Sequence, residues 1–243
     1  MQIAIDGPAG AGKSSVAREV ARRLKLAYLD TGAMYRAVTL KALQNNVDIT
    51  DGDALVLLAR TSNMDIQVDE QEGNLIYWGG ENITRAIRSP DVNKNVSVVA
   101  ESPELRKELV SLQRKIAKNA VGIVMEGRDI GTNVLPGADY KFFLTAQVNE
   151  RARRRWKEIK EKDIQSSYSF EELVEEISTR DRIDQGRADS PLLIAPGAYI
   201  LDTTPYPFQE VVEKVVTVVR EAKTAAENKD SSTCDNEVNS DVL

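Results

Sequence analysis

The chain has 243 residues, of which 42% are hydrophobic and 29% charged, so it is long enough for one globular domain that carries insertions. Residues 224–243 hold −4 of the formal net charge of −6, and the nearly neutral remainder argues against a protein built mainly to coat nucleic acid. Histidine is absent and Cys234 is the only cysteine, which excludes histidine-dependent triads, the usual zinc sites and an intramolecular disulfide.

The chain opens on a short apolar run, residues 2–5, which ends at Asp6-Gly7 and predicts a buried strand. These first residues lack the basic and apolar regions of a secretory signal. No apolar run in the chain approaches the roughly 20 residues of a membrane span. We therefore expect a cytoplasmic protein with no membrane partner.

Strands and helices alternate along the rest of the chain. Further apolar strands are predicted at residues 26–29, 121–125, 140–144 and 199–201. Helices are predicted at residues 14–26, 33–44, about 103–116 and 210–220. Ser102 is the expected N-cap of the third helix, with Pro103 at its first position. This alternation indicates a three-layer α/β fold, a five-stranded parallel sheet with helices on both faces.

Two insertions and a tail depart from this pattern. Between residues 62 and 95, apolar and polar residues alternate around the turn signal Glu72-Gly73-Asn74, which predicts a small antiparallel sheet. Between residues 149 and 197 the chain is arginine-rich and helical, and Ser169 with Glu172 forms a capping box. Beyond Lys223 the chain is polar, acidic and without periodicity, so we expect residues 224–243 to be disordered.

A glycine-rich loop follows the first strand and matches G-x-x-x-x-G-K-[ST]. It reads Gly7-Pro8-Ala9-Gly10-Ala11-Gly12-Lys13-Ser14 and is followed by Ser15. Its backbone N–H groups and the start of the next helix are expected to cradle the phosphates of a nucleoside triphosphate. Lys13 can reach the β and γ phosphates, and the Ser14 hydroxyl can hold Mg²⁺. The loop predicts triphosphate binding but says little about the acceptor of the phosphoryl group.

Two common classes of phosphate-loop protein fit this sequence poorly. A Ras-type GTPase would carry Asn-Lys-x-Asp, but Asn93-Lys94-Asn95-Val96 lacks the aspartate. A nucleic-acid motor would end an apolar strand on one or two carboxylates that hold magnesium. Here the strand runs into Glu126-Gly127-Arg128-Asp129, and the arginine between the carboxylates indicates an anion site. A strand-end turn with surface charges is the simpler alternative for this segment.

Arginines are the clearest further signal. They occur singly at Arg36, Arg106 and Arg128, as a cluster at Arg151, Arg153, Arg154 and Arg155, and again at Arg180, Arg182 and Arg187. Any one of them could belong to a solvated helix face, and the cluster could be a nucleic-acid patch. Two phosphorylated substrates would need several guanidinium groups to neutralise charge during transfer. The near-neutral body of the chain favours such a local phosphate site.

Four motifs together resemble bacterial cytidylate kinases over residues 2–223. They are the glycine-rich loop and the strings Asp30-Thr31-Gly32-Ala33-Met34-Tyr35-Arg36, Glu126-Gly127-Arg128-Asp129-Ile130-Gly131-Thr132 and Arg180-Asp181-Arg182-Ile183-Asp184. The resemblance implies a phosphate-loop kinase domain over residues 1–223, with a monophosphate-binding insertion at about 32–118 and a lid at about 149–190. It implies that ATP and CMP, and also dCMP, are converted to ADP and the corresponding diphosphates.

The resemblance also implies a set of site residues. The monophosphate end of CMP would contact Tyr35, Arg36, Arg128 and Arg187. The cytosine would be read by Ser97, Arg106 and Asp129. The ribose and the neighbouring phosphate would contact Arg180 and Asp184. Asp30 matches the active-site aspartate at the start of the monophosphate-binding region, and Lys13, Arg128, Arg180 and Arg187 would act on the phosphates in transfer. Arg151 and Arg154 fall where the lid places arginines on ATP.

These assignments agree with the chemistry of cytosine. Its exocyclic amine can donate to Asp129, while N3 or O2 can accept from Arg106. Uracil has a carbonyl in place of the amine, so Asp129 should disfavour UMP. A buried partner left unpaired can give discrimination of roughly 10⁴-fold or more.

Two alternatives remain open. One is a kinase of the same fold that acts on AMP, UMP or a sugar acid, which would leave Arg106 and Asp129 unexplained. The other is a nucleotide-dependent RNA-binding or regulatory protein that uses residues 151–155 and shows salt-sensitive binding. With CMP as acceptor, the expected partners are small nucleotides and Mg²⁺ and not nucleic acid, and nothing demands more than a monomer.

Overall fold

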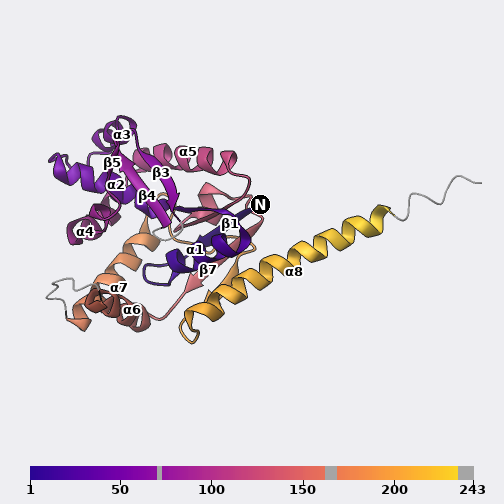
Figure 1. The fold of residues 1–243 in the computed structure, drawn as a ribbon. Coiled ribbons are helices and arrows are strands. Elements are labelled where there is room, and N and C mark those ends of the chain that lie inside the picture. Colours follow the sequence, from indigo (N-terminus) through magenta and orange to yellow (C-terminus); the bar gives the residue numbers. More distant parts are fainter. Residues whose placement is uncertain (70–72, 162–168, 235–243) are drawn as a thin grey trace, which may run out of the picture.

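A five-stranded parallel sheet forms the centre of the molecule (Figure 1). The computed structural model describes residues 1–69, 73–161 and 169–234. The strands are β1 (Gln2–Asp6), β2 (Ala27–Asp30), β6 (Ile123–Gly127), β7 (Tyr140–Thr145) and β8 (Tyr199–Asp202), in the order β2-β6-β1-β7-β8. All pairs are parallel, so the carboxyl ends of the strands meet at one edge. The predicted sheet is confirmed.

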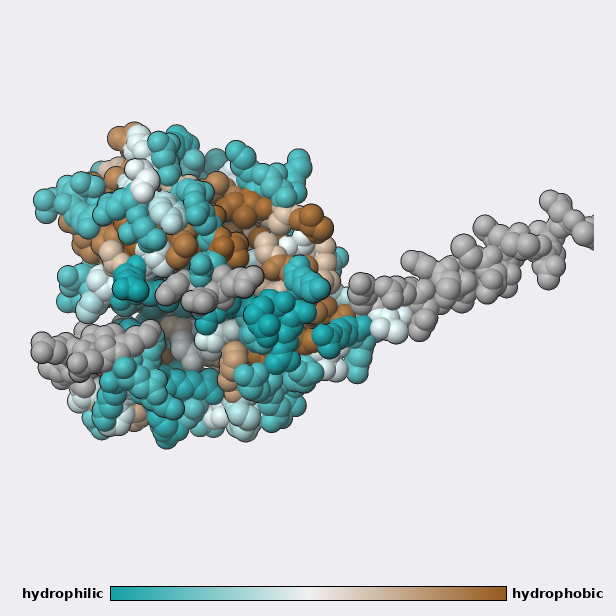
Figure 2. Space-filling view, in the orientation of Figure 1, coloured by the Kyte–Doolittle hydropathy of each residue, from teal (hydrophilic) through white to brown (hydrophobic). Residues whose placement is uncertain are grey.

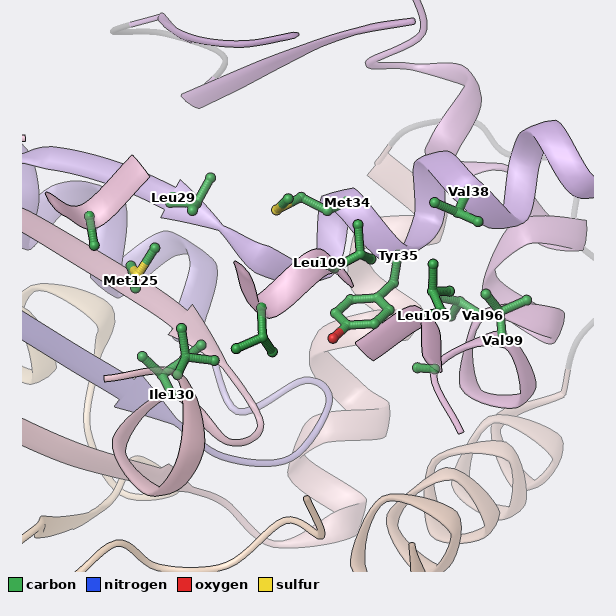
Figure 3. Packing of buried hydrophobic residues seen from close by; sticks show 14 of the residues in the cluster. Leu29, Met34, Tyr35, Val38, Val96, Val99, Leu105, Leu109, Met125 and Ile130 are labelled. Atoms are coloured by element: carbon green, nitrogen blue, oxygen red, sulfur yellow. The ribbon is translucent and has the colours of Figure 1, made fainter. Parts of the chain in front are cut away.

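Helices cover both faces of this sheet because successive strand residues point to opposite sides. Ile3 and Ile5 pack toward α1 (Lys13–Leu24) and α8 (Phe208–Cys234). Five valines of α8 are buried in the same cluster. Ala4 and Met125 pack on the other face against α2 (Thr31–Gln44) and α5 (Pro103–Asn119). Figure 3 shows this second cluster, with Tyr35 among the aliphatic side chains. The predicted Ser102 cap is present, since its side chain accepts from Leu105 N.

The predicted antiparallel insertion is present and also contains helices. The strands β3 (Asp65–Asp69), β4 (Gly73–Trp78) and β5 (Glu81–Asn82) form the small sheet. The helices α3 (Gly52–Arg60) and α4 (Pro90–Val99) lie on either side of it in the chain. Their N-caps, Asp51 and Ser89, accept from Ala54 N and Val92 N. Of the predicted turn, Glu72 lies outside the described residues, and Gly73 and Asn74 belong to β4.

The arginine-rich insertion folds as a helical hairpin. It consists of α6 (Val148–Glu161) and α7 (Phe170–Gly186), which bury Ala152, Ile159, Leu173 and Ile177 against each other. The predicted capping box of α7 is present, with Ser169 and Glu172 bonded in both directions. In Figure 1 this hairpin lies below α4 and forms the lower left part of the molecule.

The last helix is longer than the sequence predicts. α8 continues to Cys234 and projects away from the body in Figure 1, whereas we expected disorder from residue 224. Residues 224–234 contain no glycine or proline, the residues that most disfavour a helix interior. Residues 235–243 lie outside the described residues. No helix within the described ranges combines the length and apolarity that crossing a membrane requires.

Candidate active site

A cleft of about 460 Å³ lies at the carboxyl edge of the parallel sheet. The glycine-rich loop, α2, α4, α5, the end of β6 and the α6–α7 hairpin all contribute to it. Figure 2 shows the molecule hollowed between its upper and lower parts, with hydrophilic residues on both sides. The predicted site residues that line it are Ala9, Gly10, Gly12, Lys13, Ser14, Ser15, Asp30, Tyr35, Arg36, Ser97, Arg106, Arg128, Asp129, Arg154, Arg180, Asp184 and Arg187. The structure therefore brings together most residues of the expected site.

The glycine-rich loop is positioned by close packing and by an uncapped helix start. A Cβ on Gly7 would lie 1.9 Å from Leu144 O, so only glycine lets the loop pass this close to β7. Gly12 precedes α1 with φ +87° and makes no side-chain cap. The first N–H groups of α1 therefore point into the cleft with the positive end of the helix dipole behind them, an arrangement that suits phosphate.

Lys13 lies across this loop in a buried position. Its Nζ donates to Pro8 O at 2.8 Å, and only 5% of the residue is exposed. Burial, followed by the nearby positive charge of Arg128, lowers the pKa of Lys13 to about 7. A bound phosphate would supply the missing negative charge and restore the ammonium form.

Ser14 and nearby carboxylates could hold a divalent cation together with phosphate oxygens. Ser14 and the Glu126 carboxylate both line this part of the cleft, as does Asp30. Burial, with Asp30 adding to the effect, raises the pKa of Glu126. Among the described residues, no group of three or more Asp, Glu or Cys side chains forms a cage. Hydroxyl and carboxylate oxygens of this kind fit Mg²⁺, which relies largely on water and substrate phosphates.

Several cations converge beyond the loop on a buried carboxylate. Asp184 Oδ2 accepts from Arg128 Nε at 2.7 Å, and Asp184 Oδ1 accepts from Arg187. Burial, then Arg128 and Arg36, lowers the pKa of Arg180 to about 9. Burial is also the first cause of the lowered pKa values of Arg36 and Arg187. Cations that lower each other's pKa in this way form a site whose charge an anionic ligand would neutralise.

The far end of the cleft is formed by a buried ion pair. Arg106 Nη2 donates to Asp129 Oδ2 at 2.5 Å, and these residues are 2% and 6% exposed. The Arg106 guanidinium also lies 5.6 Å from the centre of the Tyr35 ring. Ser97 is buried on α4 and lines the same end. Burial raises the pKa of Tyr35 to about 12, so its hydroxyl stays protonated at neutral pH.

Asp30 is held by the small antiparallel insertion. Its carboxylate caps α2 by accepting from Ala33 N at 3.1 Å. Its backbone N–H donates to Asn74 Oδ1 at 2.6 Å, and Asn74 Nδ2 donates to Tyr28 O at 2.8 Å. The side chain of Asn74 thus pairs with the backbone at the open edge of β2 and fixes the insertion to the sheet beside Asp30.

The two lid arginines that we expected on ATP have different positions. Arg154 lines the cleft and donates from Nη2 to Thr203 O at 2.7 Å. Arg151 does not line it, because its guanidinium bonds Ala9 O at 2.9 Å and Asp181 at 2.5 Å. In this structure Arg151 therefore supports the glycine-rich loop from behind, and Arg154 is the one that a nucleotide in the cleft could contact. Gly7, Pro8 and Ala11 also lie behind the cleft lining, as parts of the loop.

Sequence reasoning missed some of the cleft residues. Arg88 and Asn93 line the cleft beside the predicted residues, as does Arg155, which the sequence indicated only as a member of the arginine cluster. Asn93 Oδ1 accepts from Arg36 Nε at 3.5 Å. The Ser89-Pro90 start of α4 was a usable signal, since it places Arg88 directly before a helix that faces the cleft.

Comparison with known proteins agrees with this geometry. The family model described as cytidylate kinase matches residues 3–221. The chain is 50% identical to a cytidylate kinase of Caldanaerobacter subterraneus subsp. tengcongensis over 90% of this chain and 95% of that protein. It is 48% identical to a cytidylate kinase of Exiguobacterium sp. over 92% and 98% of the two chains. A solved gluconokinase from Sinorhizobium meliloti 1021 covers 93% of this chain and 96% of its own at 12% identity, with a TM-score of 0.47. The chain belongs to the cytidylate kinase family.

Proposed function

We propose that the chain transfers the γ-phosphoryl group of ATP to CMP, and also to dCMP, giving ADP and the corresponding diphosphate. The observation that carries this proposal is the buried Arg106–Asp129 pair at the end of a cleft that begins at the phosphate loop. The relatives named cytidylate kinase, at 48–50% identity, support the same acceptor.

The ion pair fits cytosine better than the other pyrimidine. Asp129 can accept from the exocyclic amine of cytosine, and Arg106 can donate to N3 or O2. The uracil carbonyl at the same position would face the Asp129 carboxylate, which would leave two acceptors unpaired in a buried site. Of the two pyrimidine acceptors, CMP is therefore the one that satisfies both side chains.

The charges between the two ends of the cleft suit phosphoryl transfer. Transfer requires alignment of two phosphate groups and neutralisation of the charge on them more than it requires a strong base. Lys13, Arg128 and Arg180 surround the space between the loop and Asp184; Lys13 is buried and the two arginines are partly buried. Arg36 and Arg187 would bind the monophosphate, and Asp184 would hold the ribose end while orienting Arg128 and Arg187.

Mg²⁺ would accompany ATP, with Ser14 as the protein ligand nearest the loop. When bound, the ion supplies charge neutralisation at the β and γ phosphates. The chain's own part is to present the Ser14 hydroxyl and to keep Glu126 and Asp30 within the cleft. The cytoplasmic location and monomeric state that the sequence predicts stay predictions.

The test is a comparison of acceptors with the purified protein. ADP release from ATP and Mg²⁺ would be measured with CMP, dCMP, UMP, AMP, GMP and shikimate in parallel. Turnover with CMP and dCMP far above the rest is expected. Faster turnover with AMP or shikimate would support a kinase of this fold but contradict the assignment of the cytosine site. Turnover that depends on added RNA would favour the RNA-dependent alternative.

A further inference from the structure

Asp129 uses only one of its two carboxylate oxygens for contacts with the protein. Oδ2 accepts from Arg106 Nη2 at 2.5 Å and from Asn133 Nδ2 at 3.0 Å. No described residue donates a hydrogen bond to Oδ1, although only 6% of Asp129 is exposed. The residue lines the cleft, so Oδ1 is the oxygen that a ligand can reach.

The second donor, Asn133, is not among the residues that the sequence pointed to. It lies in a short π-helix, Ile130–Val134, directly after Asp129. Its Nδ2 is also 3.0 Å from Ser190 Oγ, in the segment that follows α7. One amide group therefore connects Asp129 with the chain segment that follows Arg187.

The backbone that carries Asn133 is fixed independently of its side chain. Asp6 accepts from Ile130 N at 2.8 Å and from Gly131 N at 2.7 Å. Arg114, on α5, donates to Asn133 O at 2.7 Å and to Val134 O at 3.0 Å. A substitution of the Asn133 side chain would leave these four bonds in place, so its effect would report on the side chain itself.

An arginine–carboxylate pair has a second favourable geometry, which competes with the single-oxygen contact observed between Arg106 and Asp129. Two parallel N–H···O bonds, one to each oxygen, are favourable for such a pair. In that arrangement both oxygens of Asp129 would face Arg106, and Oδ1 would be bonded to Arg106 and no longer turned toward a base. The Asn133 amide opposes this rotation because its bond is made only while Oδ2 stays between Asn133 and Arg106.

We propose that Asn133 is a positioning residue for base selection, which keeps Asp129 turned so that Oδ1 faces the exocyclic amine of the acceptor base. The inference rests on the proposed function, since it concerns the same cytosine site. It assigns part of the discrimination between CMP and UMP to a residue that touches neither nucleotide.

The test uses Asn133→Leu, which keeps the size of the side chain and removes its donor. We expect kcat/KM for CMP to fall about 10-fold, the scale for loss of a hydrogen bond to a charged group, with little change for UMP. The ratio of kcat/KM for CMP to that for UMP should therefore fall about 10-fold, while KM for ATP and the melting temperature stay the same. Ser190→Ala is the control, because it removes the other contact of the same amide, together with the bond from Ser190 Oγ to Asp189 Oδ1, while leaving the Asn133–Asp129 bond in place, and it should keep the ratio.

Each outcome of this test supports or overturns the inference about Asn133. If the wild-type protein prefers CMP and folded Asn133→Leu keeps that preference, the inference is overturned and the proposed function stands. If the wild-type protein does not prefer CMP, both fail. If Asn133→Leu does not fold, Asn133→Thr, which stays polar but lacks the amide, should show the same loss of preference, and an unchanged ratio there overturns the inference.

Discussion

The phosphate loop and the cytosine end of the cleft are built on different physical principles. The loop is one continuous segment, residues 7–14, and under the proposed function it would bind phosphate through backbone N–H groups and the start of α1. The cytosine end combines side chains from α2, α4, α5 and the end of β6, and acts through a buried ion pair. Under the proposed function, the loop would not distinguish one triphosphate tail from another, because every such tail offers the same oxygens. The ion pair can select a base, because its unpaired atoms match one pattern of donors and acceptors.

This difference predicts that the two ends can be damaged separately. A change at the loop should reduce transfer to every acceptor by the same factor. A change at the ion pair should reduce transfer selectively, according to the base. The predictions below use this separation, beginning with the largest expected effect.

Lys13→Ala should reduce kcat with every acceptor by about 10²–10³-fold, the scale for losing one positioned group that stabilises transition-state charge. The fold should persist, because Lys13 is buried with a pKa lowered to about 7 and its side chain bonds only Pro8 O among described residues. Steady-state kinetics and the melting temperature check this prediction. A normal rate in the folded variant would contradict the assignment of residues 7–14 as the phosphate-binding loop.

Asp129→Ala should lower kcat/KM for CMP by about 10²-fold, since the variant loses the cytosine contact and leaves Arg106 buried without its carboxylate. ATP affinity, measured by titration calorimetry, should change little. Asp129→Asn is the matched variant, because it keeps the volume and removes the charge. Equal losses of CMP turnover and ATP affinity would instead point to a magnesium-binding or structural function.

Binding of ATP should take up a proton at pH 8. The pKa of Lys13 is lowered to about 7 by burial and then by Arg128, so the amine is mostly neutral before the phosphates arrive. The phosphate charge favours the ammonium form, so ATP binding should take up more of a proton at pH 8 than at pH 6. Calorimetry in buffers of different ionisation enthalpy measures this number. Lys13→Met should abolish the dependence on buffer, and a wild-type heat that does not depend on buffer would contradict the prediction.

The smallest effect concerns Asp6, which holds the π-helix beneath the cytosine end. Burial raises the pKa of Asp6 from 3.8 to about 6, although the N–H groups of Gly131 and Ile130 oppose the shift. A raised pKa means that the folded state binds the proton more tightly, so the stability it contributes is lost as pH rises through about 6. The free energy of unfolding of the wild type, relative to Asp6→Asn, should fall by about 1–2 kcal/mol between pH 5 and pH 8. Urea unfolding at the two pH values tests this, and an equal or rising difference would contradict it.

The strands, the helices next to them and the loop could be predicted from the sequence because their signals are local. Strand spacing, the Ser102 cap and the Ser169–Glu172 box all lie within a few residues of the element that they define. The position of Arg106 against Asp129 could not be worked out in this way, because the two residues are 23 positions apart and on different elements. The resemblance to a family placed them together, and the structure shows the pair.

Neither the local sequence patterns nor the family resemblance predicted three features of the structure. Asn74 pairs with the edge of β2 from a hairpin more than 40 residues away, and no local pattern marks it. Arg151 bonds Asp181 and the glycine-rich loop, contacts that the sequence did not predict, and its expected contact with ATP stays a prediction. The extension of α8 to Cys234 depends on helix propensity, which an argument from hydrophobic periodicity does not include.

The most direct test of the account is a competition between two acceptors in one tube. The protein would be given ATP labelled at the γ phosphate, Mg²⁺, and equal amounts of CMP and UMP, and the labelled products would be separated by chromatography. The account predicts that the label appears in CDP far ahead of UDP, with little released as inorganic phosphate. Equal labelling of CDP and UDP would contradict the assignment of Arg106 and Asp129 as readers of cytosine.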